Sequence, residues 1–274
     1  MQIGIFAKTF AGHSALPVLR AAKTAGYETA QFNLACLGLP SMPDEIAPDV
    51  PGIIAAASKQ TGVSIAAISA TYNMIHPYPS VRDKGQRRLG HIIAAAKTMG
   101  TSLVTLCTGT RNAEDQWQHH PENTTLEAWR DLTTEMAKAL QVAEQHGVHL
   151  GIEPELANVV SSAVHAKRLL DDMQSPNLRI ILDPANLFET ASSPERQRLV
   201  EEAVDLLGPH IAMAHAKDRN ANGEFVAAGA GVIDFKHFVT QLRRAHFDGP
   251  LVTHGLAEDE AEGVAKFLRG VVAS

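Results

Sequence analysis

The chain has 274 residues, of which 45% are hydrophobic and 20% are charged, as in soluble globular proteins with a substantial core. Its formal net charge of −6 argues against a nucleic-acid partner, because binding to a phosphate backbone needs clustered positive charge. No stretch approaches the roughly 20 apolar residues that cross a membrane, and two cysteines, Cys36 and Cys107, are too few for a disulfide framework. We therefore predict a cytoplasmic protein that binds neither nucleic acid nor membrane.

Short β-branched runs alternate with longer helical patterns along the whole sequence. The expected strands cover residues 2–6, 28–33, 64–71, 102–106, 148–152, 179–182, 211–214 and 250–253. The expected helices cover residues 14–25, 52–61, 81–99, 124–146, 161–173, 194–207, 235–245 and 258–272. Eight strands and eight helices in strict alternation predict a parallel sheet closed into a (β/α)8 TIM barrel, an α/β fold in which residues 1–274 form one domain.

An open, doubly wound sheet is the alternative for such an alternation. That architecture usually carries a glycine-rich phosphate loop directly after its first strand. Residues 7–12 read Ala-Lys-Thr-Phe-Ala-Gly, which lacks the pattern. The barrel is therefore favoured.

The last four expected strands each end at a potential metal ligand, namely Glu153, Asp183, His215 and His254. In a parallel barrel the carboxyl ends of the strands meet on one face, where barrel enzymes hold their active sites. Each residue alone also fits a structural role, as a hydrogen-bonded histidine or a helix cap. Two carboxylates and two imidazoles together suit one divalent ion, with Mn²⁺ preferred and Zn²⁺, Co²⁺ or Mg²⁺ as alternatives.

Polar residues in other expected loops are candidates for substrate contact. Lys217 and Arg219 follow the seventh strand and suit a carbonyl, carboxylate or phosphate, although ion pairs with neighbouring acids are an equal alternative. His76, beyond the third strand, is a further candidate, with a structural hydrogen bond in its loop as the alternative. A long loop after the fourth strand carries Arg111 and Trp117, and we expect it to act as a lid that excludes water, with Arg111 reaching the substrate.

The motif His-Ala-Lys-Asp at residues 215–218, the later Gly-Ala-Gly-Val-Ile-Asp-Phe at residues 229–235, and the acids Glu153 and Asp183 resemble the xylose isomerase-like TIM-barrel superfamily. That superfamily includes tagatose 3-epimerase-type sugar epimerases, inosose isomerases and dehydratases, and endonuclease IV. The resemblance implies that Glu153, Asp183 and His215 bind a metal ion and that Glu153 is also a catalytic acid/base. The two glycines then belong to the loop that enters the seventh helix.

The sequence departs from the sugar-epimerase pattern at two positions. The fourth ligand of the family maps to His254, where the epimerases carry a glutamate that pairs with the one matching Glu153. His254 would then serve as both ligand and second acid/base, with Glu155 and Glu258 as less direct candidates for the lost carboxylate. Asn186 stands where the epimerases have a substrate-binding histidine, and it is our candidate for holding a substrate hydroxyl.

We therefore predict a metal-dependent isomerase or epimerase of a sugar or sugar derivative, in which Glu153 transfers a proton through a metal-bound enediolate and His254 or Glu153 returns it. A lyase or dehydratase acting on a keto-sugar or keto-inositol is the alternative reaction. A non-catalytic sugar-binding barrel is the alternative of another class, and an endonuclease IV-like activity does not suit the acidic chain. The expected partner is a small-molecule carbohydrate, and family analogy allows a homo-oligomer.

Overall fold

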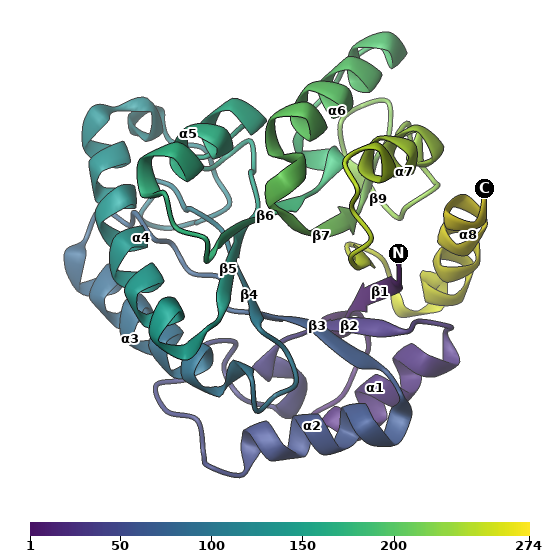
Figure 1. Ribbon diagram of the computed structural model, residues 1–274, viewed down its shortest axis with the longest axis horizontal. Coiled ribbons are helices and arrows are strands. Elements are labelled where there is room, and N and C mark those ends of the chain that lie inside the picture. The colour runs from purple at the N-terminus through teal and green to yellow at the C-terminus, as the bar shows by residue number, and fades with distance from the viewer.

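Eight parallel strands close into a barrel in the computed structural model, which describes residues 1–274 (Figure 1). The barrel order is β1-β10-β7-β6-β5-β4-β3-β2, so the first strand pairs with the last. The strands are β1 (Ile3–Phe6), β2 (Thr29–Phe32), β3 (Ser64–Ser69), β4 (Leu103–Leu106), β5 (His149–Ile152), β6 (Leu178–Leu182), β7 (Ile211–Ala216) and β10 (Leu251–Thr253). The predicted TIM barrel is confirmed.

A helix follows each barrel strand, and the helices form a ring around the sheet (Figure 1). They are α1 (Ala15–Thr24), α2 (Val50–Thr61), α3 (Pro79–Ala96), α4 (Leu126–His146), α5 (Ala163–Met173), α6 (Ser193–Leu207), α7 (Phe235–Arg244) and α8 (Ala261–Ala273). Glycines in the left-handed conformation end two of them, Gly62 after α2 and Gly147 after α4. None of the helices has the length and apolar composition needed to cross a membrane.

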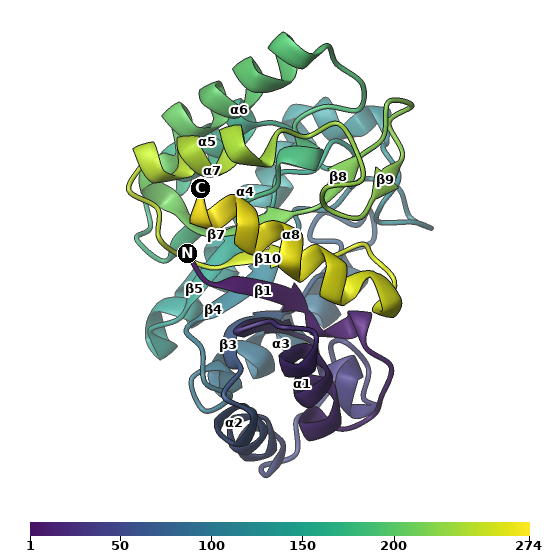
Figure 2. The ribbon, with the colours of Figure 1, turned by 90° about the vertical axis from the view of Figure 1, so that its right-hand side faces the viewer.

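The structure adds short elements, most of which lie outside the predicted helices and strands. Six 3₁₀ turns occur, at Ala7–Thr9, Leu34–Leu37, Pro121–Thr124, Pro184–Asn186, Gly208–His210 and Glu258–Glu260. A small antiparallel hairpin of β8 (Asp218–Arg219) and β9 (Phe225–Val226) follows β7. In the side view this hairpin lies beyond the carboxyl ends of the barrel strands (Figure 2). Strands of two residues are too short for a periodic signal, which explains why the hairpin was missed.

Two layers of apolar side chains hold the fold. The larger cluster contains 67 buried residues and includes the apolar faces that the helices turn toward the sheet. A second cluster, with members from five barrel strands, consists of Ala67, Leu103, Ile181, Met213 and Val252. A barrel interior filled in this way is a packed core.

Candidate functional site

The four predicted ligands converge at the carboxyl-end face of the barrel. Glu153 and Asp183 directly follow β5 and β6, His215 lies near the end of β7, and His254 directly follows β10. One ligand atom from each side chain can be chosen so that all four lie within 4.8 Å of one another. Four donors at this spacing surround a volume suited to a single ion.

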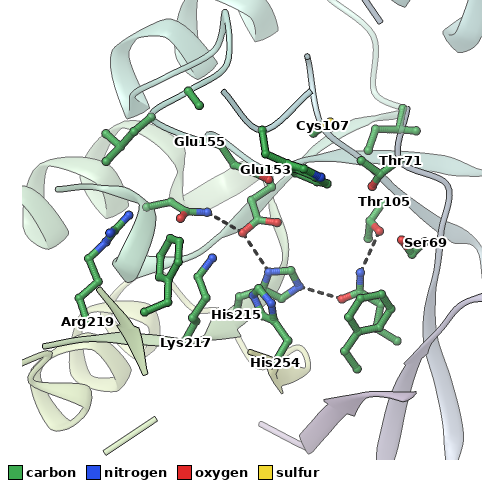
Figure 3. Close-up of a pocket in the computed structure, with 18 of the residues that line it drawn as sticks. Ser69, Thr71, Thr105, Cys107, Glu153, Glu155, His215, Lys217, Arg219 and His254 are labelled. Atoms are coloured by element: carbon green, nitrogen blue, oxygen red, sulfur yellow. Dashed lines mark hydrogen bonds and ion pairs between the residues drawn. The ribbon is translucent and has the colours of Figure 1, made fainter. Parts of the chain in front are cut away.

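The imidazole of His215 is held on both sides (Figure 3). Its Nε2 lies 2.8 Å from Oε1 of Gln31, and its Nδ1 lies 3.1 Å from Oε1 of Glu153. The side-chain amide of Gln31 donates to Oγ1 of Thr105 at 3.0 Å, so its carbonyl oxygen faces the histidine. A neutral His215 therefore carries its hydrogen on Nε2 and turns the Nδ1 lone pair toward Glu153.

Asp183 is buried and is surrounded by nitrogen atoms. Its Oδ2 lies 3.3 Å from Nε2 of His254 and 3.5 Å from Nζ of Lys217, while Oδ1 accepts from the backbone N–H of Ala185 at 2.9 Å. Burial alone would raise the pKa of Asp183, but the charge of Lys217 and the hydrogen bond from His254 hold that pKa far below its usual value. The carboxylate is therefore ionised at neutral pH.

Glu153 is also ionised, although it is mostly buried. Burial would raise its pKa, but the charge of a protonated His215 and the hydrogen bond that its Nδ1 then donates outweigh this effect and lower it. The pKa of His254 is lowered, mainly by burial and then by His215, so that its imidazole is neutral at pH 7. Ionised carboxylates and neutral imidazoles are the forms that bind divalent ions.

Glu155, two residues beyond Glu153, has the opposite character. Burial and the neighbouring charge of Glu153 raise its pKa to about 8. It lines the same cavity (Figure 3). Two neighbouring acids therefore differ in protonation at neutral pH, Glu153 being ionised and Glu155 largely protonated.

Three of the four residues, Glu153, His215 and His254, border a cavity of about 720 Å³ that opens at the carboxyl-end face. Polar side chains from the strand ends and apolar side chains from the loops line it together. The lining residues are Phe6, Gln31, Ser69, Thr71, Thr105, Leu106, Cys107, Trp117, His119, Glu153, Glu155, Leu156, Ala157, Asn186, Glu189, His215, Lys217, Arg219, Phe225 and His254. A cavity of this size and mixed polarity suits a small organic ligand.

Three of the predicted substrate contacts line this cavity. Asn186 is buried and donates through Nδ2 to Oε1 of Glu153 at 2.9 Å. Lys217 lies with its Nζ 3.9 Å from the centroid of the Phe225 ring, beside Asp183. Arg219 stacks on the same ring and donates to the carbonyl oxygens of Ala185 and Gly223, so much of its hydrogen-bonding capacity supports the hairpin.

The other two predicted contacts lie outside the cavity. His76 borders a neighbouring hollow, where its Nε2 lies 3.1 Å from the carbonyl oxygen of Ala113 and its Nδ1 accepts from the backbone of Tyr78. Arg111 is buried, and its guanidinium binds Asp131 at 2.7 Å and the carbonyl oxygen of Ile75 at 3.2 Å. Both side chains hold the β3–α3 and β4–α4 loops in place.

A single buried carboxylate organises the loop between β8 and α7. Asp218 accepts hydrogen bonds from the backbone N–H groups of Arg219, Gly229, Gly231 and Ile233 at 2.8 to 3.1 Å. A Cβ atom on Gly231 would lie 2.1 Å from the carbonyl oxygen of Arg219, so only glycine fits there. The two glycines belong to the loop that enters α7, as the sequence indicated.

Two residues of the site were not predicted from the sequence: Gln31, which contacts His215 from across the barrel, and Thr105, which holds the Gln31 amide. Both are buried polar residues within short apolar strands, β2 and β4. A buried polar side chain needs a hydrogen-bonding partner. A polar residue within an apolar strand therefore indicates that a hydrogen bond is made. The strand pattern does not identify the residue across the barrel that makes it.

Comparison with known proteins places the chain in a family. Residues 19–270 match the model of the family described as xylose isomerase-like TIM barrel. No curated protein matches the sequence.

Several solved structures share the fold. The 3-keto-D-glucoside 4-epimerase from E. coli is 18% identical, with 100% of both chains covered and a TM-score of 0.75. The probable 3-DHS dehydratase AsbF from Bacillus anthracis is 14% identical, with 98% of this chain and 99% of that chain covered and a TM-score of 0.78. The IOLI protein, solved with a bound zinc atom, is 17% identical, with 100% and 98% covered and a TM-score of 0.75.

The chain also matches part of a longer protein. It aligns over 98% of its length with a xylose isomerase-like TIM barrel/4-hydroxyphenylpyruvate dioxygenase fusion protein, at 18% identity and a TM-score of 0.74, and spans 42% of that chain. At these identities the structural likeness shows the fold alone.

The contact between Arg111 and Asp131 predicts a pH-dependent contribution to stability. Burial would raise the pKa of Asp131, but hydrogen bonds from Arg82 and Arg111 outweigh it and lower that pKa. Asp131→Asn should therefore reduce the free energy of unfolding by on the order of 1 kcal/mol at pH 7, because the carboxylate is partly exposed and screened. This loss of unfolding free energy should be fully present at pH values above the pKa of Asp131 in the unfolded chain, about 4. It should shrink as the pH falls through the lower pKa of Asp131 in the folded protein.

Urea unfolding of both proteins at pH 7, 5, 4 and 3 measures this difference. Asp205→Asn, which removes an exposed pair with Arg244, is the control and should change the unfolding free energy little. A deficit for Asp131→Asn that persists unchanged at pH 3 would contradict the electrostatic explanation.

Proposed function

The chain belongs to the xylose isomerase-like TIM barrel family, and we propose that it is a metal-dependent isomerase or epimerase of a sugar or sugar derivative. The convergence of Glu153, Asp183, His215 and His254 within 4.8 Å at the floor of the cavity carries this proposal. A sugar carbonyl and its neighbouring hydroxyl could approach them from the cavity. The partner is therefore a small-molecule carbohydrate.

The contact between His215 and Glu153 supports a cation at this position. With its hydrogen on Nε2, a neutral His215 presents its Nδ1 lone pair to Oε1 of Glu153 at 3.1 Å. Two electron-rich atoms at that distance repel one another unless a proton or a metal ion lies beside both. The second pair, His254 and Asp183 at 3.3 Å, offers donors of the same two kinds. The residues present therefore fit a divalent ion.

The donor set narrows the choice of ion. Two carboxylate oxygens and two imidazole nitrogens suit Mn²⁺, Zn²⁺ or Co²⁺ better than Mg²⁺, because Mg²⁺ prefers ligands that are all oxygen atoms. We propose Mn²⁺ first. The zinc atom in the structure of the IOLI protein supports Zn²⁺ as the alternative. Bound here, the ion would polarise the substrate carbonyl and lower the cost of the negative charge that develops when the adjacent C–H proton leaves.

Glu153 is placed to take that proton. Its Oε1 is engaged by Asn186 and His215, while its Oε2 has no hydrogen-bonding partner in the protein. Glu153 also lines the cavity, so this second oxygen can meet a substrate carbon (Figure 3). Its lowered pKa keeps it in the basic form at neutral pH.

The proton must be returned to the substrate either by a second residue or by Glu153 itself. His254 lines the cavity from the end of β10, three strands away from β5 around the barrel, and is our first candidate. Proton return to the other face of the same carbon gives an epimer, and return to the neighbouring carbon gives an isomer. Lys217 and Asn186 are proposed to hold the oxygen atoms of the substrate during the transfer.

Elimination is the alternative reaction, and one observation favours it. The position of His254 supplies an imidazole where an epimerase would supply a second carboxylate, so a symmetric pair of bases on opposite faces is lacking. With the same initial proton removal, loss of a β-hydroxyl would give a dehydrated product. The likeness to a probable dehydratase of Bacillus anthracis is consistent with this chemistry.

Metal content tests the proposed site directly. Protein purified without chelator or affinity tag should contain about one divalent ion per chain, because four donors converge on one position. His254→Ala should retain less metal, since one donor is lost. Elemental analysis by mass spectrometry measures both. A chain that holds no metal after incubation with Mn²⁺ or Zn²⁺ would contradict the metal mechanism and favour a non-catalytic sugar-binding barrel.

Exchange of substrate hydrogen with solvent tests the role of Glu153. We expect a screen of keto-sugars in D₂O to reveal incorporation of deuterium beside the carbonyl, and Glu153→Gln to reduce the rate by at least about a hundredfold, because the base is removed. Glu202→Gln, an exposed change outside the cavity, is the matched control and should exchange at the wild-type rate. NMR spectroscopy distinguishes an isomerised product from a dehydrated one. Wild-type exchange by Glu153→Gln would exclude Glu153 as the base.

Gln31 should influence the metal without touching it. Gln31→Leu removes the acceptor that orients His215, and we expect metal affinity to fall about 10- to 100-fold. Gln31→Glu keeps an acceptor and should bind the metal at least as well as the leucine variant does. Competition of the metal-free proteins with a chromogenic chelator measures these affinities. Unchanged affinity in Gln31→Leu would show that His215 needs no such support.

A further inference from the structure

The cavity changes character from its floor to its mouth. At the floor the lining residues His215 and Asn186 are each only 3% exposed, and Glu153 beside them is also polar. At the mouth three large apolar side chains line the same cavity and remain open to solvent, namely Trp117 at 52%, Phe225 at 50% and Leu156 at 36% exposure. These three side chains add apolar surface above the polar floor.

These three side chains come from three separate loops. Trp117 lies between β4 and α4, Leu156 lies between β5 and α5, and Phe225 stands on β9 of the hairpin. The structure has nine exposed large hydrophobic residues, and isolated ones are normal on protein surfaces. Three of the nine line the same cavity, and we call these three residues together the apolar mouth.

The apolar mouth is held in place by contacts that do not involve a ligand. Asn123, from the loop that carries Trp117, donates through Nδ2 to the carbonyl oxygen of Ala157 at 2.9 Å, beside Leu156. The ring of Phe225 contacts the cations of Lys217 and Arg219, each 3.9 Å from its centroid. A surface organised before binding spends less of its interaction energy on ordering its own loops.

We propose that the apolar mouth binds an aromatic or alkyl substituent of a sugar-derived substrate, such as the aglycone of a keto-glycoside, whose carbonyl-bearing part reaches the floor. This inference rests on the proposed function for the floor and adds the substrate class. The volume of about 720 Å³ agrees, because pockets of roughly 300 to 1,000 Å³ enclose drug-sized ligands, which are larger than a monosaccharide. Trp117 supplies the largest apolar surface for the substituent.

A pair of matched ligands tests the proposal. Isothermal titration calorimetry on the full chain compares phenyl β-D-glucopyranoside with methyl β-D-glucopyranoside, which differ only in the apolar group. We expect the phenyl glycoside to bind at least about tenfold more tightly, because burial of roughly 60 to 100 Å² of apolar surface corresponds to that factor or more. Trp117→Ala and Leu156→Ala should each reduce the preference severalfold.

The controls are exposed apolar residues that do not line the cavity. Tyr78→Ala and Leu126→Ala remove side chains that are 61% and 69% exposed, and both should keep the wild-type preference. Circular dichroism checks that all four variants are folded. Equal affinity for the two glycosides, no measurable binding of the phenyl glycoside, or an unchanged preference in both mouth variants would overturn the proposal.

This experiment separates the mouth from the floor. A phenyl preference that depends on Trp117, in a protein that neither holds metal nor exchanges substrate hydrogen, would support the apolar mouth and refute the proposed reaction. Metal binding and hydrogen exchange without any phenyl preference would support the reaction and restrict the substrate to an unsubstituted sugar.

Discussion

The burial of two carboxylates side by side constrains this molecule more than any other interaction. Glu153 and Asp183 lie at neighbouring strand ends and are both ionised, a state that burial opposes. Lys217 compensates part of the charge, and the imidazoles of His215 and His254 each contact one of the carboxylates. The same group of carboxylates and imidazoles suits a divalent cation. The nitrogen neighbours that stabilise the buried carboxylates in the fold therefore also complete the proposed metal site.

Closure of the barrel joins the two halves of the chain at this site. The four candidate ligands all come from the second half of the sequence, at the carboxyl ends of β5, β6, β7 and β10. Gln31 and Thr105, from β2 and β4 in the first half, reach across and orient His215. The β7 ligand therefore has its correct orientation only when the whole ring has formed.

The sequence predicted the barrel and the convergence of Glu153 and His254 for two reasons. The end of each strand can be located from the local pattern, and a parallel barrel brings all carboxyl ends of its strands to one face. It could not identify Gln31 as a neighbour of His215, since that contact depends on side-chain orientation across the barrel. It placed Arg111 near the substrate because loop residues after a strand often reach the site. The structure instead directs that guanidinium toward Asp131, a helix residue that no strand pattern links to it.

The carboxylate of Asp218 gives the loop above the site an unequal tolerance to mutation. The Asp218 carboxylate, at the start of this loop, accepts hydrogen bonds from the backbone N–H groups of Gly229 and Gly231 at its other end, so both ends are fixed. The tip between them, from Asn220 to Phe225, is largely exposed and makes its hydrogen bonds mainly within itself. During evolution the tip can thus accept substitutions and insertions that alter ligand preference, while the anchored ends preserve Lys217 and the reactive floor. Variants with an altered tip would therefore bind different ligands and still keep the residues of the floor.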